Sequence, residues 1–104
     1  MKVQISNEVL AVEDGTYSAV IDTVQPYGDA NGILIKLRLD DSRTLVKFYK
    51  LDDLGAYPWS TLFRALNSND TDDLIGQKVE IEIVNNVSKI SGNEFCNIRK
   101  IRLI

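Results

Sequence analysis

The sequence contains no histidine and only one cysteine, Cys96, among its 104 residues. Without histidine, neither a Ser-His-Asp nor a Cys-His nucleophile system can form, and the commonest protein ligand of metal ions is missing. A lone cysteine builds neither an internal disulfide nor a cysteine-based zinc site. We therefore expect a non-enzymatic protein with no catalytic residues, no metal and no cofactor.

Long apolar runs are absent as well. No stretch approaches the roughly 18 apolar residues that a membrane-spanning helix needs, and residues 1–10 lack the basic start and apolar block of a signal peptide. The expectation is a cytoplasmic protein without a membrane partner. The length of 104 residues and an apolar fraction of 44% indicate a single globular domain over residues 1–104.

Several acidic residues come in adjacent pairs. Such pairs could indicate a metal-dependent nuclease, because its metal site needs several converging carboxylates. Each pair follows a predicted strand or enters a predicted turn or helix, where aspartate satisfies local backbone donors. We therefore interpret these pairs as turn and capping residues: Asp40 with Asp41, Asp52 with Asp53, and Asp72 with Asp73.

Positive charge is gathered in two segments although the net charge is −3. Between Ile33 and Lys50 the basic residues outnumber Asp40 and Asp41, and the last residues carry Arg99, Lys100 and Arg102. Residues 52–73 are acidic instead. This segregation indicates one basic face rather than a surface that attracts phosphate everywhere.

Strand patterns dominate the chain. Ile33, Ile35, Leu37 and Leu39 alternate with polar residues, which predicts one buried and one solvated face. A tight turn over 40–43 returns the chain, and this connection predicts Val46 and Phe48 on one side of the next strand and Lys47 and Tyr49 on the other. The predicted strands are 16–27, 33–40, 44–51, 78–84 and 95–103, with a loop over 85–92.

One helix interrupts the strands. Pro58 suits a first helical position, and Trp59, Leu62, Phe63 and Leu66 follow at helical spacing until Asn67. Residues 1–14 are expected to form an additional N-terminal strand or an arm. The prediction is a mainly β domain with a helix between the third and fourth of five strands, the element order of a Greek-key OB-fold barrel.

The chain also resembles the small OB-fold single-stranded DNA-binding proteins of phages and integrating conjugative elements. The resemblance covers residues 15–104 and rests on Gly15-Thr16-Tyr17, on the block Leu74 to Val79, and on Asn97-Ile98. It implies DNA rather than RNA as ligand, a role in replication, recombination or transfer of a mobile element, and an ability to assemble with further copies.

The predicted binding residues lie on the second and third strands. If Ile33, Ile35, Leu37 and Leu39 point inward, Lys36 and Arg38 point outward, and we expect Lys47 and Tyr49 beside them. Single-stranded nucleic acid needs this combination, because cations follow the phosphates while aromatic rings stack on bases. The same residues equally fit a solvated strand face without a ligand.

Loop residues extend the candidate site. Tyr27 lies in the first hairpin loop and Lys89 in the loop before the last strand, which border the groove of an OB-fold. Arg99 and Arg102 are expected to pair with Glu80 and Glu82 on the neighbouring strand. Trp59 is expected to pack in the core or at its rim.

Two functions from different classes follow. The first is a single-stranded DNA-binding protein of low sequence specificity that uses Lys36, Arg38, Lys47, Tyr49, Tyr27 and Lys89. The alternative is a β-barrel protein-interaction or assembly module that does not bind nucleic acid. The alternative predicts that the basic residues are ion-paired or scattered and that an apolar patch is exposed.

Overall fold

The computed structural model describes residues 8–9, 12–28, 31–87 and 94–104. This part of the chain is mainly β. Its elements are β1 (Glu8–Val9), β2 (Gly15–Tyr27), β3 (Gly32–Leu39), β4 (Thr44–Lys50), the 3₁₀ turn η1 (Leu51–Gly55), α1 (Trp59–Leu66), the 3₁₀ turn η2 (Thr71–Leu74), β5 (Lys78–Val87) and β6 (Glu94–Leu103).

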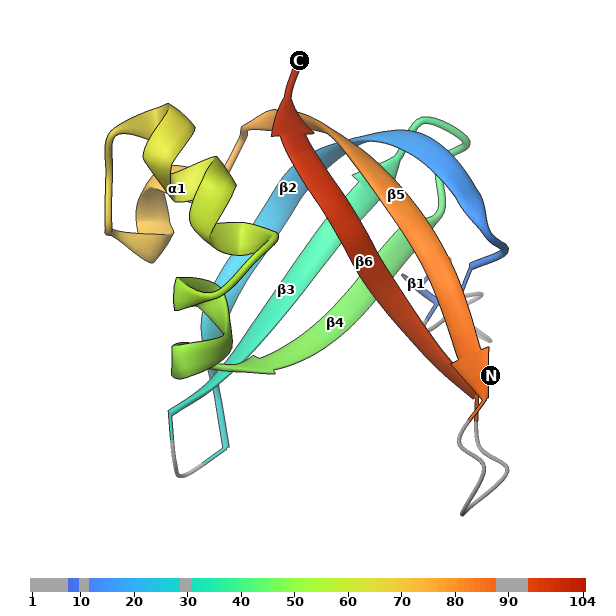
Figure 1. Cartoon of the computed structure of the whole chain (residues 1–104), viewed down its shortest axis with the longest axis horizontal. Helices are drawn as coiled ribbons and strands as arrows, with labels where there is room; N and C mark the ends of the chain where they lie inside the picture. The colour runs from blue at the N-terminus through green and yellow to red at the C-terminus, as the bar shows by residue number, and fades with distance from the viewer. Residues whose placement is uncertain (1–7, 10–11, 29–30, 88–93) are drawn as a thin grey trace, which may run out of the picture.

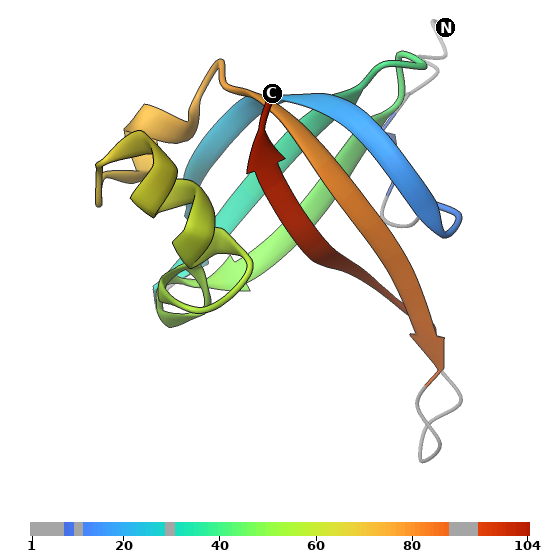
Figure 2. The same ribbon diagram turned by 45° about the horizontal axis from the view of Figure 1, so that its top comes forward.

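Five strands pair in antiparallel fashion in the order β4-β3-β2-β5-β6, and the two-residue β1 adds a parallel edge to β4. The long strand β2 joins the two halves, because its first part pairs with β5 and its second part with β3. The sheet curls, so that β5 and β6 cross over β3 and β4 (Figures 1 and 2). Among the described strands no ladder joins β4 to β6, so the closed Greek-key barrel stays a prediction.

Most element boundaries match the sequence prediction, with one clear difference. Residues 85–87 were predicted as loop, whereas they continue β5 and pair with β6. The backbone N–H and side-chain amide of Asn85 donate to Asp14 Oδ1, each at 2.8 Å, and the amide also donates to the Val12 carbonyl. These partners explain why a polar residue extends a strand at this position.

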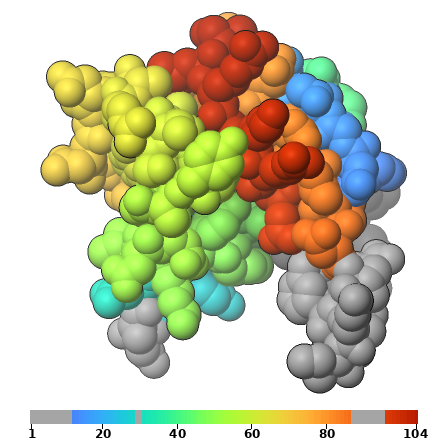
Figure 3. All heavy atoms as spheres, viewed as in Figure 1, coloured from blue at the N-terminus to red at the C-terminus, as the bar shows by residue number. Residues whose placement is uncertain are grey.

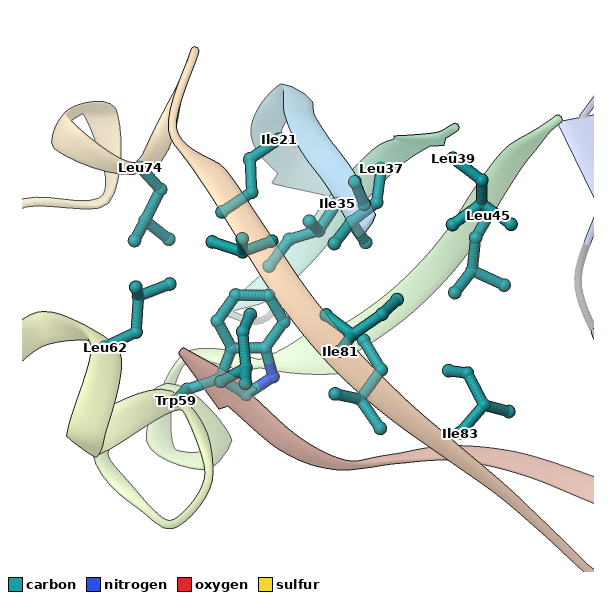
Figure 4. Close-up of a cluster of buried hydrophobic side chains, with 14 of the residues drawn as sticks. Ile21, Ile35, Leu37, Leu39, Leu45, Trp59, Leu62, Leu74, Ile81 and Ile83 are labelled. Carbon is teal, nitrogen blue, oxygen red and sulfur yellow. The ribbon is translucent and has the colours of Figure 1, made fainter. Parts of the chain in front are cut away.

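The core lies between the two halves of the curled sheet. Leucine, isoleucine and valine side chains from β2 to β6 meet there, and α1 contributes Trp59 and Leu62, each 1% exposed (Figure 4). The predicted packing role of Trp59 is confirmed. Asn67 ends α1 at φ 52°, in the left-handed region that asparagine tolerates, which confirms the predicted helix end.

Two of the aspartate pairs have a member that accepts from a local backbone N–H, as predicted, whereas at η2 the capping acceptor is Asp70. Asp41 accepts from the Arg43 backbone N–H at 3.0 Å, and Asp53 accepts from the Lys50 backbone N–H at 2.9 Å. Asp72 and Asp73 occupy the first turn of η2. Within the described ranges, no group of three or more acidic or cysteine side chains is placed to hold a metal ion.

None of the helices in the described residues is long and apolar enough to cross a membrane.

Candidate nucleic-acid interface

The β3-β4 hairpin has two faces that differ from those the sequence predicts. Lys36 pairs with Val46, whereas Lys47 pairs with Ile35 and Tyr49 with Ile33. Residues directly opposite each other in an antiparallel pair share a face. Lys36 and Arg38 therefore lie on the outer face, while Lys47 and Tyr49 lie on the core side. The expectation that these four residues form one patch is wrong.

The physical reason is the length of the turn. The backbone N–H of Leu39 donates to the Arg43 carbonyl at 2.7 Å, so the loop has three residues, 40–42, instead of the four expected. Ser42 takes φ 75°, the left-handed position at the end of a three-residue hairpin loop. A one-residue change in register moves every side chain of the returning strand to the other face.

The same change brings an aromatic side chain to the outer face. Phe48 pairs with Leu34, and its ring lies 4.9 Å from the ring of Tyr27, centroid to centroid, at an interplanar angle of 50°. Both rings are open to solvent, since Tyr27 is 55% and Phe48 49% exposed. Leu34 is buried beside them, although it belongs to the outer face. We call Tyr27 and Phe48 the aromatic pair.

The hairpin between β2 and β3 positions Tyr27. A Cβ atom at Gly32 would collide with the Tyr27 carbonyl oxygen, so only glycine allows the two strands to approach here. Gly28 and Asn31 both have positive φ, 73° and 53°, as the reversal of the chain requires. The Asn31 carbonyl accepts the Leu51 backbone N–H at 2.7 Å and ties this hairpin to the end of β4.

Cations flank the aromatic pair on the outer face. By register Lys50 lies opposite Gly32, and Lys36 follows Leu34 by two residues. Arg38 lies further along β3, where its guanidinium is 3.9 Å from Asp22, and both side chains are about half exposed. Such a loose exposed pair contributes little stability and can exchange its partner.

Arg43, by contrast, adds no net charge to this face. Its side chain donates to Asp41 at 2.9 Å and to Glu13 at 3.2 Å, and these hydrogen bonds raise the pKa of the guanidinium.

Lys47 and Tyr49 face the opening between β4 and β6, which we call the seam. The Lys47 ammonium donates to the Cys96 carbonyl oxygen of β6, and burial lowers the pKa of Lys47 below its ordinary value. Tyr49 stands edge-on to Trp59, with ring centroids 5.4 Å apart. Burial also raises the pKa of Tyr49 to about 12.

A cavity of about 590 Å³ lies at the seam. Figure 3 shows this side of the molecule, with the green atoms of β4 and η1 beside the red atoms of β6. Phe48 is also among the residues that line this cavity, at the edge of β4. The other lining residues are Lys47, Tyr49, Asp53, Ala56, Tyr57, Pro58, Trp59, Cys96, Asn97 and Ile98.

The remaining predicted residues divide into two groups. Arg102 pairs with Glu80 at 2.9 Å and Arg99 with Glu82 at 3.7 Å, which confirms the expected cross-strand pairs. Arg102 thus has a close carboxylate partner, whereas Arg99 shares Glu82 with Lys100, which lies 4.0 Å from that carboxylate. Lys89 lies outside the described residues.

Sequence reasoning missed Phe48 and Lys50 as parts of the outer face. Both are even-numbered residues of β4, and the four-residue turn assumed for 40–43 directs Phe48 inward. The signal available in the sequence is the run Asp40-Asp41-Ser42, a polar triplet that fits a three-residue loop.

A scan against models of known protein families finds no match to the chain, and a search of curated proteins finds no match either.

Proposed function

We propose that the protein binds single-stranded nucleic acid on the outer face of β2, β3 and β4, without catalysing a reaction. The observation that carries this proposal is the solvent-exposed aromatic pair, Tyr27 and Phe48, flanked by Lys50 and Lys36 on one sheet face. Contiguous exposed apolar surface of this kind is typical of ligand-binding and partner-binding sites.

The strand order supports an OB-fold as the framework. The order β4-β3-β2-β5-β6, with α1 between β4 and β5, fits a partly open barrel of five strands. In such a barrel the ligand lies over the second and third strands, which correspond here to β3 and β4. The proposal therefore keeps the fold expected from the sequence and moves the aromatic part of the site from Tyr49 to Phe48.

Binding on this face follows from elementary interactions. Bases stack on Tyr27 and Phe48, each stack contributing roughly 1 to 3 kcal/mol, while Lys36, Arg38 and Lys50 attract the phosphates. Stacking accepts every base, so sequence specificity is low. We extend the proposal to single-stranded DNA as ligand and to a cytoplasmic role in replication, recombination or transfer of a mobile element, with assembly into oligomers, as the sequence resemblance implies.

A titration of labelled oligo-dT of roughly 25 nucleotides, followed by fluorescence anisotropy, tests the proposal. We expect saturable binding that exceeds binding to a duplex and to the matching RNA. Phe48→Ala should weaken it about 5- to 100-fold, because one stacking platform is lost. Ile75→Ala removes a similarly exposed apolar side chain, 47% exposed, near the end of η2, and should leave the affinity unchanged.

The dependence of the affinity on salt concentration provides a second criterion in the same titration. Three phosphate contacts on a single strand predict that log K falls by about 2 for each tenfold increase in salt. No binding at about 20 mM salt, where screening is weak, would contradict the proposal.

A second candidate function is a protein-interaction module. It is favoured by the apolar residues exposed at this end of the sheet, Tyr27, Phe48 and Leu51, and by the pairing of the β6 arginines with glutamates. A failed oligonucleotide titration at low salt supports this second function for the same face.

A further inference from the structure

Another cavity lies outside the sheet, among η1, α1 and η2. Figures 1 and 2 show these three elements gathered on one side of the curled sheet. The cavity has a volume of about 450 Å³, within the range of ligand pockets, and we call it the lobe pocket. Its lining residues come from η1, from α1 and from the segment that leads into η2: Leu51, Leu54, Gly55, Ser60, Phe63, Asn69 and Thr71.

The lobe pocket offers apolar surface that the core leaves partly open. Leu51 is 46% exposed, and Phe63 packs against the core but is only partly buried. Leu54, by contrast, is buried in the core and holds η1 in place. There is open space beside Gly55, where an added Cβ atom would meet no atom within 4 Å. Partly open apolar side chains beside a pocket are typical of sites where a partner inserts an apolar anchor.

Two exposed carboxylates adjoin the residues that line the pocket. Asp52 follows Leu51 in η1, and Asp72 follows Thr71 in η2. Within the described part of the chain, neither carboxylate has a hydrogen-bond or ion-pair partner. Both can therefore meet the cations of a partner without giving up an interaction within the protein.

The charge around the pocket is negative as a whole. Arg64 is the only basic residue among residues 51–76. Three further aspartates of this segment accept hydrogen bonds from local donors: Asp53, Asp70 and Asp73. The pocket therefore attracts cationic partners and repels the phosphates of a nucleic acid.

We propose that the lobe pocket binds a lysine- or arginine-rich segment of a partner protein, which inserts one leucine-sized apolar side chain against Leu51 and Phe63. Charge complementarity with Asp52 and Asp72 selects the basic segment, and the apolar wall accepts the anchor. The inference does not depend on the proposed function, because Tyr27, Phe48 and the cations of the outer face are not among the lining residues of the pocket.

Titration of the full protein into a fluorescein-labelled peptide, in which one leucine lies between two pairs of lysines, tests the proposal. We expect saturable binding at about 20 mM salt that weakens as salt is added, because salt screens exposed charges. Replacing the leucine of the peptide by alanine should weaken binding about 3- to 10-fold, since less apolar surface is buried. Equal affinity of the two peptides, or no binding at low salt, would overturn the proposal.

Matched variants of the protein separate the pocket from general charge attraction. Asp52→Asn and Asp72→Asn should each weaken binding of the leucine peptide about 2- to 5-fold, as the loss of one exposed ion pair predicts. Asp40→Asn removes the same charge from the turn between β3 and β4 and should leave the affinity unchanged. Leu51→Ala should weaken binding about 3-fold or more. Ile75→Ala truncates a similarly exposed side chain that does not line the pocket, and should have no effect.

The position of the contact is measured by nuclear magnetic resonance of the ¹⁵N-labelled protein with the unlabelled peptide. We expect the largest amide shifts in residues 51–55, 60–64 and 69–73. Shifts centred on β3 and β4, or equal losses of affinity in Asp40→Asn and Asp52→Asn, would overturn the inference. Self-association of the protein without peptide, measured by sedimentation and abolished by Leu51→Ala, would assign the pocket to a second copy and overturn it too.

Discussion

Tyr27 and Tyr49 show how one residue type takes two roles on two strands of the same sheet. Tyr27 ends β2 on the outer face, exposes more than half of its surface and pairs with Phe48. Tyr49 is largely withdrawn from water and stands edge-on to Trp59. The first is suited to stacking on a ligand, and the second to holding a hydroxyl inside the seam.

The burial of Tyr49 predicts a loss of stability at alkaline pH. Its pKa is about 12 in the folded protein and 10.0 without the fold. Between these values the unfolded state loses its proton first, so the free energy of unfolding falls as pH rises. Two pKa units correspond to at most about 2 to 3 kcal/mol.

Urea unfolding at pH 9 and pH 11 measures this effect. The drop in stability between the two pH values should be smaller in Tyr49→Phe than in the wild type, because phenylalanine does not ionise. Tyr27→Phe, which alters an exposed hydroxyl, should show the wild-type drop. Equal drops in all three proteins would contradict the burial of the Tyr49 hydroxyl.

At the scale of elements, the turn between β3 and β4 decides which side chains of β4 lie on the outer face. Ser42 holds the left-handed conformation, φ 75°, that makes the three-residue loop. A side chain there costs roughly 1 to 2 kcal/mol relative to glycine, partly offset by the greater freedom of glycine in the unfolded chain.

Substitution at this position therefore has a definite order of stabilities. Ser42→Gly should stabilise the protein by about 0.5 to 1 kcal/mol, and Ser42→Val should destabilise it by more than about 1 kcal/mol, because a β-branched residue resists positive φ. Chemical denaturation of the three proteins measures the order. A valine variant as stable as the wild type would show that residue 42 is not left-handed.

This turn also explains how far the sequence could predict the site. Alternation in β3 correctly predicts its two faces, because Ile35 and Leu37 are buried and Arg38 is exposed. The face of β4 depends on the loop length. Position 42 holds serine instead of the glycine that normally marks a left-handed loop residue, so the sequence gives no clear signal of a three-residue loop. Lys36 and Arg38 were therefore placed correctly, whereas Lys47 and Tyr49 were assigned to the wrong face.

The helix and the last strand were easier to predict for physical reasons. The spacing of Trp59, Leu62 and Phe63 defines one apolar stripe, and Asn67 ends it. The alternating glutamates of β5 face the basic residues of β6, so the ion pairs follow from pairing alone. No such local sequence pattern predicts the seam, because the seam forms only when β6 crosses over β4.

At the scale of the whole molecule, acidic and basic side chains are concentrated on different elements. The lobe formed by η1, α1 and η2 carries exposed aspartates, among them Asp52, Asp70 and Asp72, whereas Lys36, Arg38 and Lys50 lie on β3 and β4. The acidic lobe disfavours phosphates, so under the proposed function a single-stranded nucleic acid is directed towards the outer face of the sheet.

The measurement that tests this account most directly is a nuclear magnetic resonance titration of the ¹⁵N-labelled protein with unlabelled oligo-dT. We predict that the largest amide shifts occur in residues 25–27, 32–38 and 46–50, around the aromatic pair, with smaller shifts at 96–98 across the seam. Residues 68–74 of the acidic lobe should not respond. Shifts confined to that lobe or to the outer side of β5 and β6, or no shifts at low salt, would contradict the account.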